Sequence, residues 1–110
     1  NLKLCESDYK FMSIIWENEP IRSGKLVKLK KSTTYTTLKK VCDKGLAQNE
    51  NTIVTSLVKK EEVQEFESKH IVEESFSGSL PSFLASFFAG KKISDKEANE
   101  LKKLIDDFKE

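Results

Sequence analysis

A run rich in β-branched residues lies between segments that favour helices. This run, residues 52–57, follows a polar two-residue break, a pattern that predicts a small β-hairpin. Apolar residues at helical spacing from Phe11 to Trp16 predict a first helix with Ser7 as its N-cap, and a shorter second one follows. A third is expected over residues 32–44, with Gly45 as its left-handed C-terminal cap. Three helices and a hairpin in this order predict a winged helix-turn-helix.

The second half of the sequence predicts three more helices. The first covers about residues 61–76, and Ser94 and Glu97 form a capping-box pattern that opens the last. The expected fold class is therefore mostly α with a small β-hairpin. We expect a winged-helix DNA-binding domain at residues 1–60 and a helical dimerisation domain at residues 61–110.

The charge of the chain is distributed unequally along it. The whole sequence carries 19 Lys and Arg against 18 Asp and Glu, a net charge of +1. Residues 1–60 nevertheless have 12 basic and 6 acidic side chains, whereas residues 61–110 have 7 and 12, so the net charges are +6 and −5. Such asymmetry predicts different partners for the two halves, and only the first half suits phosphates.

Lysines and hydroxyl groups gather around the expected third helix. Residues 25–44 hold seven lysines and one acidic residue, Asp43, and the lysines surround a run of hydroxyl side chains at 32–37. Lysines, hydroxyls and a helix N-terminus all bind phosphate oxygens, and Thr methyl groups can contact thymine. This pattern predicts a DNA-binding surface. The alternatives are a solvated lysine face or an adaptor that docks an acidic protein partner, and a wing tip (49–51) without Lys or Arg weakens the DNA hypothesis.

Apolar residues in the second half exceed what its own helices can cover. Four phenylalanines fall within residues 76–88. Burial against a second copy of the chain explains this surface most simply, although packing onto the N-terminal half is the alternative. The expected homodimer interface consists of Phe76, Leu80, Phe83, Leu84, Phe87, Phe88, Leu101, Leu104, Ile105 and Phe108.

Catalysis, metal binding and membrane insertion have little support in the sequence. His70 is the only histidine, and Cys5 and Cys42 lie 37 positions apart without the CxxC spacing of a zinc site. We expect two ordinary thiols in a reducing cytoplasm, no cofactor, no metal and no enzymatic activity. No apolar run approaches the ~20 residues of a membrane span, and no signal peptide is recognisable.

Three segments resemble the penicillinase-repressor (BlaI/MecI/CopY) family. They are ESDYKFMSIIWENEPI (6–21), KKSTTYTTLKKVCDKGL (30–46) and GSLPSFLASFFAGKKISDKEANELKKLIDDF (78–108). A Trp that closes the first helix, a K-S-T-x-Y recognition helix, K-G-L before the wing and S-x-x-E-x-x-x-L in the last helix occur together in that family. The resemblance implies a cytoplasmic bacterial transcriptional repressor, a homodimer that binds palindromic operators in double-stranded DNA.

The resemblance also implies roles for individual residues. The residues that it places toward the operator are Ser32, Thr33, Tyr35, Thr36 and Lys40. It places Lys31 and Lys39 at phosphates. Tyr35 stands where some members have Arg. Because Tyr cannot make the bidentate pair of Arg with guanine, the operator sequence does not transfer.

Three departures limit what the resemblance implies. Family members usually have more residues between the second and third helices. Either residues 30–32 form a tight turn here, or residues are missing from the sequence near Lys30. The resemblance to the family favours missing residues. Antibiotic-responsive members are cleaved by a regulatory protease at an Asn-Phe bond, but the matching pair here is Ser86-Phe87, which argues against cleavage there. Copper-responsive members have a C-terminal Cys-x-Cys cluster, and no cysteine follows Cys42.

Overall fold

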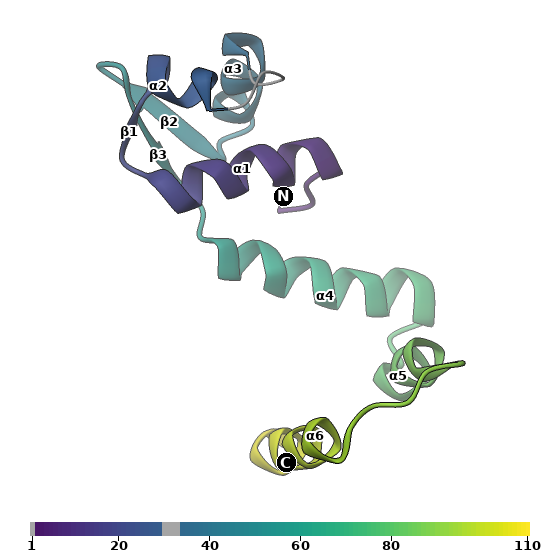
Figure 1. Cartoon of the computed structure of the whole chain (residues 1–110). Coiled ribbons are helices and arrows are strands. Elements are labelled where there is room, and N and C mark those ends of the chain that lie inside the picture. The colour runs from purple at the N-terminus through teal and green to yellow at the C-terminus, as the bar shows by residue number, and fades with distance from the viewer. Residues whose placement is uncertain (1, 30–33) are drawn as a thin grey trace. The chain divides into compact units, whose positions relative to one another are not determined.

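The computed structural model describes residues 2–29 and 34–110 (Figure 1). In this part of the chain, six helices and one three-stranded antiparallel sheet follow one another. The elements are α1 (Glu6–Asn18), β1 (Ile21–Arg22), α2 (Ser23–Lys28), α3 (Tyr35–Asp43), β2 (Ala47–Glu50), β3 (Ile53–Ser56), α4 (Lys60–Phe76), α5 (Leu80–Phe88) and α6 (Asp95–Phe108). The expected fold class, a mostly α chain with a winged helix followed by helices, is confirmed.

The chain divides into two compact units, Asn1–His70 and Ile71–Glu110. The division falls inside α4, whose Val63 is fully buried within the first unit. The domain limits at residues 1–60 and 61–110 stay a prediction.

The core of the first unit lies between α1, α3 and the sheet. Its fully or almost fully buried apolar side chains come from every element of the unit up to β3, and from Leu46 just before β2: Phe11, Met12, Ile15, Ile21, Leu26, Leu38, Val41, Leu46, Ala47 and Val54. Each large apolar side chain that leaves water stabilises the fold by roughly 1.5–3 kcal/mol. Because α3 contributes Leu38 and Val41 to this core, its opposite side is left at the surface.

The sheet contains a strand that the sequence did not predict. Its order is β1-β3-β2, and β1 pairs with β3 through Ile21 opposite Val54 and Arg22 opposite Ile53. A strand of two residues is too short to show an alternating pattern, so only the β2–β3 hairpin was expected. The hairpin turn uses Asn51 and Thr52, both with positive φ, and lies one residue after the expected break.

Two helix starts differ from the predictions. Helix α1 begins at Glu6 with Cys5, not Ser7, in the N-cap position. Helix α3 begins at Tyr35 instead of residue 32, because the Thr34 hydroxyl accepts a hydrogen bond from the Thr37 N–H at 3.2 Å. In a run of hydroxyl residues the sequence alone does not show which one caps the helix. The connection at residues 30–33, for which a tight turn or missing residues are expected, lies outside the described residues.

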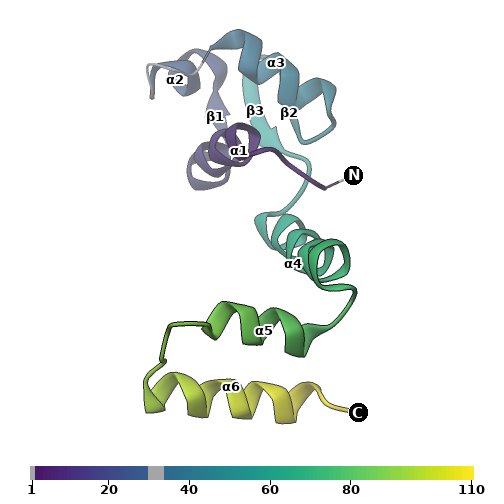
Figure 2. The ribbon, with the colours of Figure 1, turned by 90° about the vertical axis from the view of Figure 1, so that its right-hand side faces the viewer.

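The second unit consists of the end of α4 with α5 and α6, and Figure 2 shows α5 and α6 side by side. Ser79 caps α5 and Ser94 caps α6, as the capping pattern predicted for the latter. Gly78 and Gly90 have positive φ where α4 and α5 end. No residue of 71–110 is buried within the chain. Among the described residues, no helix has the length and apolar character needed to cross a membrane.

Candidate nucleic-acid interface and helical surface

Helix α3 presents a polar face opposite the side that packs into the core. Leu38 and Val41 are buried, whereas Thr36, Lys39 and Lys40, each one or two residues from the nearest of them, lie on the exposed side. This division follows from the 3.6-residue period of the helix. Thr36, Lys39 and Lys40 line one open depression together with Asp43 and Lys44. The arrangement offers hydroxyl and ammonium donors on one surface.

Tyr35 begins α3 and leans toward α2. Its side chain is 59% exposed, and a Cβ placed on Gly24 of α2 would lie 3.6 Å from the tyrosine oxygen. The ring therefore sits where the two helices of the helix-turn-helix approach each other. Its hydroxyl remains able to donate to a base or a phosphate.

Lys39 has a carboxylate partner on its own helix. Its Nζ donates to Asp43 Oδ2 at 2.8 Å, and both side chains are mostly exposed. The hydrogen bond and the charge of Asp43 raise the pKa of Lys39. Exposed pairs of this kind contribute little to stability, so a phosphate can replace Asp43 at low cost.

Lys40 and Lys44 share a second carboxylate, which comes from α1. Asp8 is 1% exposed, its Oδ1 lies 3.4 Å from Lys40 Nζ, and its Oδ2 accepts a hydrogen bond from Lys44. Burial alone would raise the pKa of Asp8. The hydrogen bonds from Lys44 and Cys5 and the charges of both lysines outweigh burial and lower this pKa from its ordinary 3.8. The contacts of Asp8 with the two lysines hold α3 against α1, and the carboxylate neutralises part of the positive charge of the lysines.

The end of α1 holds the C-terminal end of the wing. Trp16 Nε1 donates to the Val58 carbonyl at 2.9 Å. Glu19 accepts hydrogen bonds from the backbone N–H of Ser56 at 2.8 Å and from its hydroxyl. Polar groups of four residues, joined across 42 and 37 positions of the sequence, thereby set the position of β3 relative to α1. The Trp that closes the first helix thus has a specific structural role.

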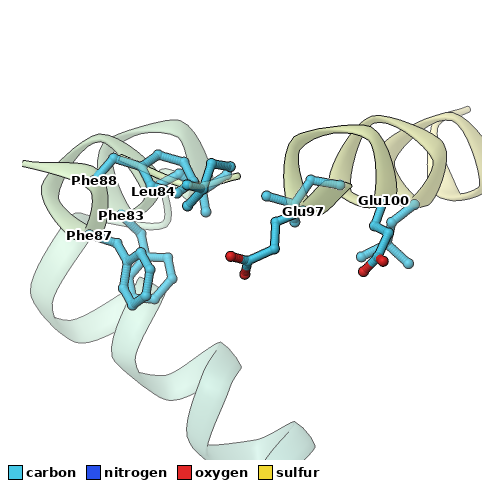
Figure 3. A pocket seen from close by; sticks show the side chains of 9 residues that line it. Phe83, Leu84, Phe87, Phe88, Glu97 and Glu100 are labelled. Atoms are coloured by element: carbon cyan, nitrogen blue, oxygen red, sulfur yellow. The ribbon is translucent and has the colours of Figure 1, made fainter. Parts of the chain in front are cut away.

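In the second unit, apolar side chains of α5 and α6 face each other across a groove (Figure 3). Its walls are Phe83, Leu84, Phe87, Phe88, Ile93, Leu101 and Leu104, with Glu97 and Glu100 at the side of α6. A second hollow is lined by Leu80, Leu104, Ile105, Phe108 and Lys109. The Phe76 ring packs edge-on against Phe83 at 5.4 Å. The structure therefore gathers nine of the ten residues expected at a dimer interface in two hollows, and the tenth packs against one of them.

The sequence model of the penicillinase repressor family matches residues 4–107, nearly the whole chain. The chain belongs to the penicillinase repressor family. The match confirms the resemblance, and the family is one of transcriptional repressors. Among curated proteins, none matches the sequence significantly.

In this penicillinase repressor family member, four of the seven residues expected at DNA can be placed. Tyr35, Thr36, Lys39 and Lys40 are all exposed on α3. The expected contacts of Lys31, Ser32 and Thr33 fall outside the described residues. The sequence did not reveal that Asp8 partners Lys40, because the two lie 32 positions apart and no local pattern joins them.

Within residues 2–29 and 34–110, no three His, Cys, Asp or Glu side chains are grouped so that they could hold a metal ion. The His70 ring stacks on Phe66 of the same helix with centroids 5.6 Å apart. Cys5 and Cys42 are both free thiols.

Proposed function

We propose that this protein is a homodimeric transcriptional repressor that binds a palindromic operator in double-stranded DNA through α3. One observation carries the proposal: a helix with exposed hydroxyl and lysine side chains stands on the winged-helix unit of a chain from a repressor family. The protein would act in the bacterial cytoplasm, where free Cys5 and Cys42 stay reduced. The proposal needs no cofactor, and no regulatory protease acting at Ser86-Phe87.

The proposed DNA contacts divide into two classes. Tyr35 and Thr36, near the start of α3, would face base edges in the major groove. Lys39, one turn later, would contact a phosphate, and Lys40 would face the operator as well. Lys39 is paired with Asp43, and both side chains are mostly exposed. A DNA phosphate would take the place of Asp43 as the partner of Lys39, so the charge of Lys39 is paired both before and after binding.

The second unit supports the homodimer. Helices α5 and α6 contain no buried residue, and Leu80, Phe87, Leu104, Ile105 and Phe108 are all more than half exposed. Apolar area of this kind contributes about 25 cal/mol for each Å² removed from water. A second copy offers a self-complementary surface of the same composition. Two subunits would also present two α3 helices, which matches a palindromic operator.

Operator binding can be tested without knowledge of the regulated gene. Repeated selection from a random duplex library yields a candidate site, and fluorescence anisotropy then compares it with a scrambled duplex at ~150 mM salt. We expect clear preference for the selected duplex. A folded dimer without such preference contradicts the proposal and favours an adaptor that binds an acidic protein.

Two variants separate the proposed contact classes. Thr36→Val keeps the shape of the side chain but removes the hydroxyl, and it should reduce discrimination between the two duplexes by roughly 1–3 kcal/mol. Lys39→Gln should instead weaken binding to both duplexes by the same factor and lower the log–log salt slope by about 0.9 for each subunit. Equal losses on both duplexes for Thr36→Val would remove that residue from sequence recognition.

A further inference from the structure

The hairpin that forms the wing has no basic residue of its own. Its two strands and turn, residues 47–56, contain one charged side chain, that of Glu50. A carboxylate near the tip of a wing repels phosphate. Any cation at this edge must therefore come from another element of the unit.

Strand β1 brings such a cation to the hairpin. In β1, Ile21 is buried against the core, so the next residue, Arg22, points to the opposite, exposed face. Arg22 lies opposite Ile53 of β3, and the Ser23 N–H donates to the Thr52 carbonyl at 2.8 Å. Thus β1 and the first residue of α2 hold Arg22 beside the hairpin turn.

The arginine side chain also bonds to the turn directly. Arg22 Nη1 donates to Thr52 Oγ1 at 3.3 Å, and Thr52 is one of the two turn residues with positive φ. Among the ion pairs of the described residues, none includes Arg22. A guanidinium has five N–H donors in a fixed fork, so one bond to Thr52 leaves most of them for an anion.

The location of Arg22 suits a contact with the DNA that α3 is proposed to bind. In Figure 1 the β2–β3 turn and α3 both lie above α1, with α2 between them. We propose that Arg22, held by Thr52, is the wing's cation and binds a backbone phosphate of the operator beside the groove that receives α3. This inference rests on the proposed function and adds a contact from β1, outside both the recognition helix and the hairpin.

The test measures the salt dependence of binding for three variants on the selected and the scrambled duplex. Arg22→Gln removes the charge, Arg22→Lys retains it, and Lys10→Gln on α1 is the matched control with the same loss of charge. Between about 50 and 200 mM salt, Arg22→Gln should lower the log–log slope by about 0.9 for each subunit. It should weaken both duplexes by the same factor, while Arg22→Lys and Lys10→Gln keep the wild-type slope.

Two results would overturn the inference. In the first, Arg22→Gln behaves like Lys10→Gln, so that Arg22 makes no phosphate contact. In the second, the loss is confined to the selected duplex, so that Arg22 contacts a base. Failure of the wild-type protein to prefer its selected duplex would instead refute the proposed function itself, and this inference with it. Circular dichroism on the same samples verifies that each variant is folded, as expected for an exposed side chain.

Discussion

Asp8 of α1 and Lys40 of α3 form an ion pair of 3.4 Å between a carboxylate that is almost fully buried and an ammonium group that is half exposed. Lys44 binds the other oxygen of the same carboxylate. A buried charge is tolerated only where partners satisfy it, so the two lysines make Asp8 an electrostatic link between the core and the proposed recognition helix.

Removal of this charge should destabilise the first unit. In Asp8→Asn the amide keeps the size of the side chain but loses both ion pairs, and the free energy of unfolding should fall by about 1.5–3 kcal/mol. Urea denaturation followed by the fluorescence of Trp16, the single tryptophan, reports on this unit. Glu6→Gln is the control, because the ion pair of Glu6 with Lys10 is mostly exposed and should contribute almost nothing to stability. Equal losses of unfolding free energy in Asp8→Asn and Glu6→Gln would show that Asp8 does not link α1 to α3 more strongly than an exposed ion pair stabilises α1.

The same residue predicts a pH dependence. The pKa of Asp8 is lowered in the folded state, so the unfolded state binds more protons as the solution is acidified. The stabilisation by Asp8 is therefore complete above its unfolded pKa of about 3.8 and is lost as pH falls through the lower folded value. The difference in unfolding free energy between wild type and Asp8→Asn should shrink as pH falls from about 6 to about 3. A difference that stays constant over this range would assign the stabilisation to packing.

Asp43 is expected to limit DNA affinity. It lies among the exposed residues of α3 and holds Lys39 at 2.8 Å. Asp43→Asn removes a negative charge from the proposed DNA surface and releases Lys39, so it should strengthen binding to selected and scrambled duplexes by the same factor. Anisotropy measures both, with Glu17→Gln on α1 as the control of equal charge change. Weaker binding by Asp43→Asn would indicate that Asp43 itself contacts a base.

The two cysteines should differ in reactivity. Hydrogen bonds from the Ser7 side chain and the Asp8 backbone lower the pKa of exposed Cys5, whereas burial and the charge of Asp43 raise the pKa of Cys42. Because the thiolate is the reactive form, iodoacetamide should alkylate Cys5 faster at neutral pH. Rates measured on Cys42→Ala and Cys5→Ala isolate each thiol. A faster reaction at Cys42 would contradict the environments described for both.

Most of the features that could be predicted from the sequence depend on local patterns, such as helical periodicity and capping motifs. The buried Leu38 and Val41 fix which side of α3 is exposed, and that side follows from helical period alone. The Ser94 hydroxyl caps α6 by accepting a hydrogen bond from the N–H of Glu97, three positions away. The capping-box motif in the sequence predicts this contact.

What the sequence missed depends on contacts between distant residues. Arg22 pairs with Ile53 across 31 positions, and Asp8 meets Lys40 across 32. Neither contact leaves a periodic signal, because each arises only when separate elements pack together. The position of Arg22 beside the wing and the pairing of Asp8 with Lys40 could therefore be found only in the folded unit.

The predicted dimer can be tested at the groove between α5 and α6. Phe87 is about half exposed there, and its ring lies near those of Phe83 and Phe88. Phe87→Asp places a charge in a surface that dimerisation would remove from water, so the cost of burying this charge should favour monomers. Sedimentation equilibrium should then give half the wild-type mass.

Ser82→Asp provides the matched control for this experiment. Ser82 is exposed on the same helix, and helical spacing places it opposite the side that holds Phe83 and Phe87. The same charge at this position should leave the mass of the dimer unchanged. An unchanged mass for Phe87→Asp would exclude Phe87 from the interface. A wild-type protein that sediments as a monomer would remove the homodimer from the proposal altogether, and with it the reason to expect a palindromic operator.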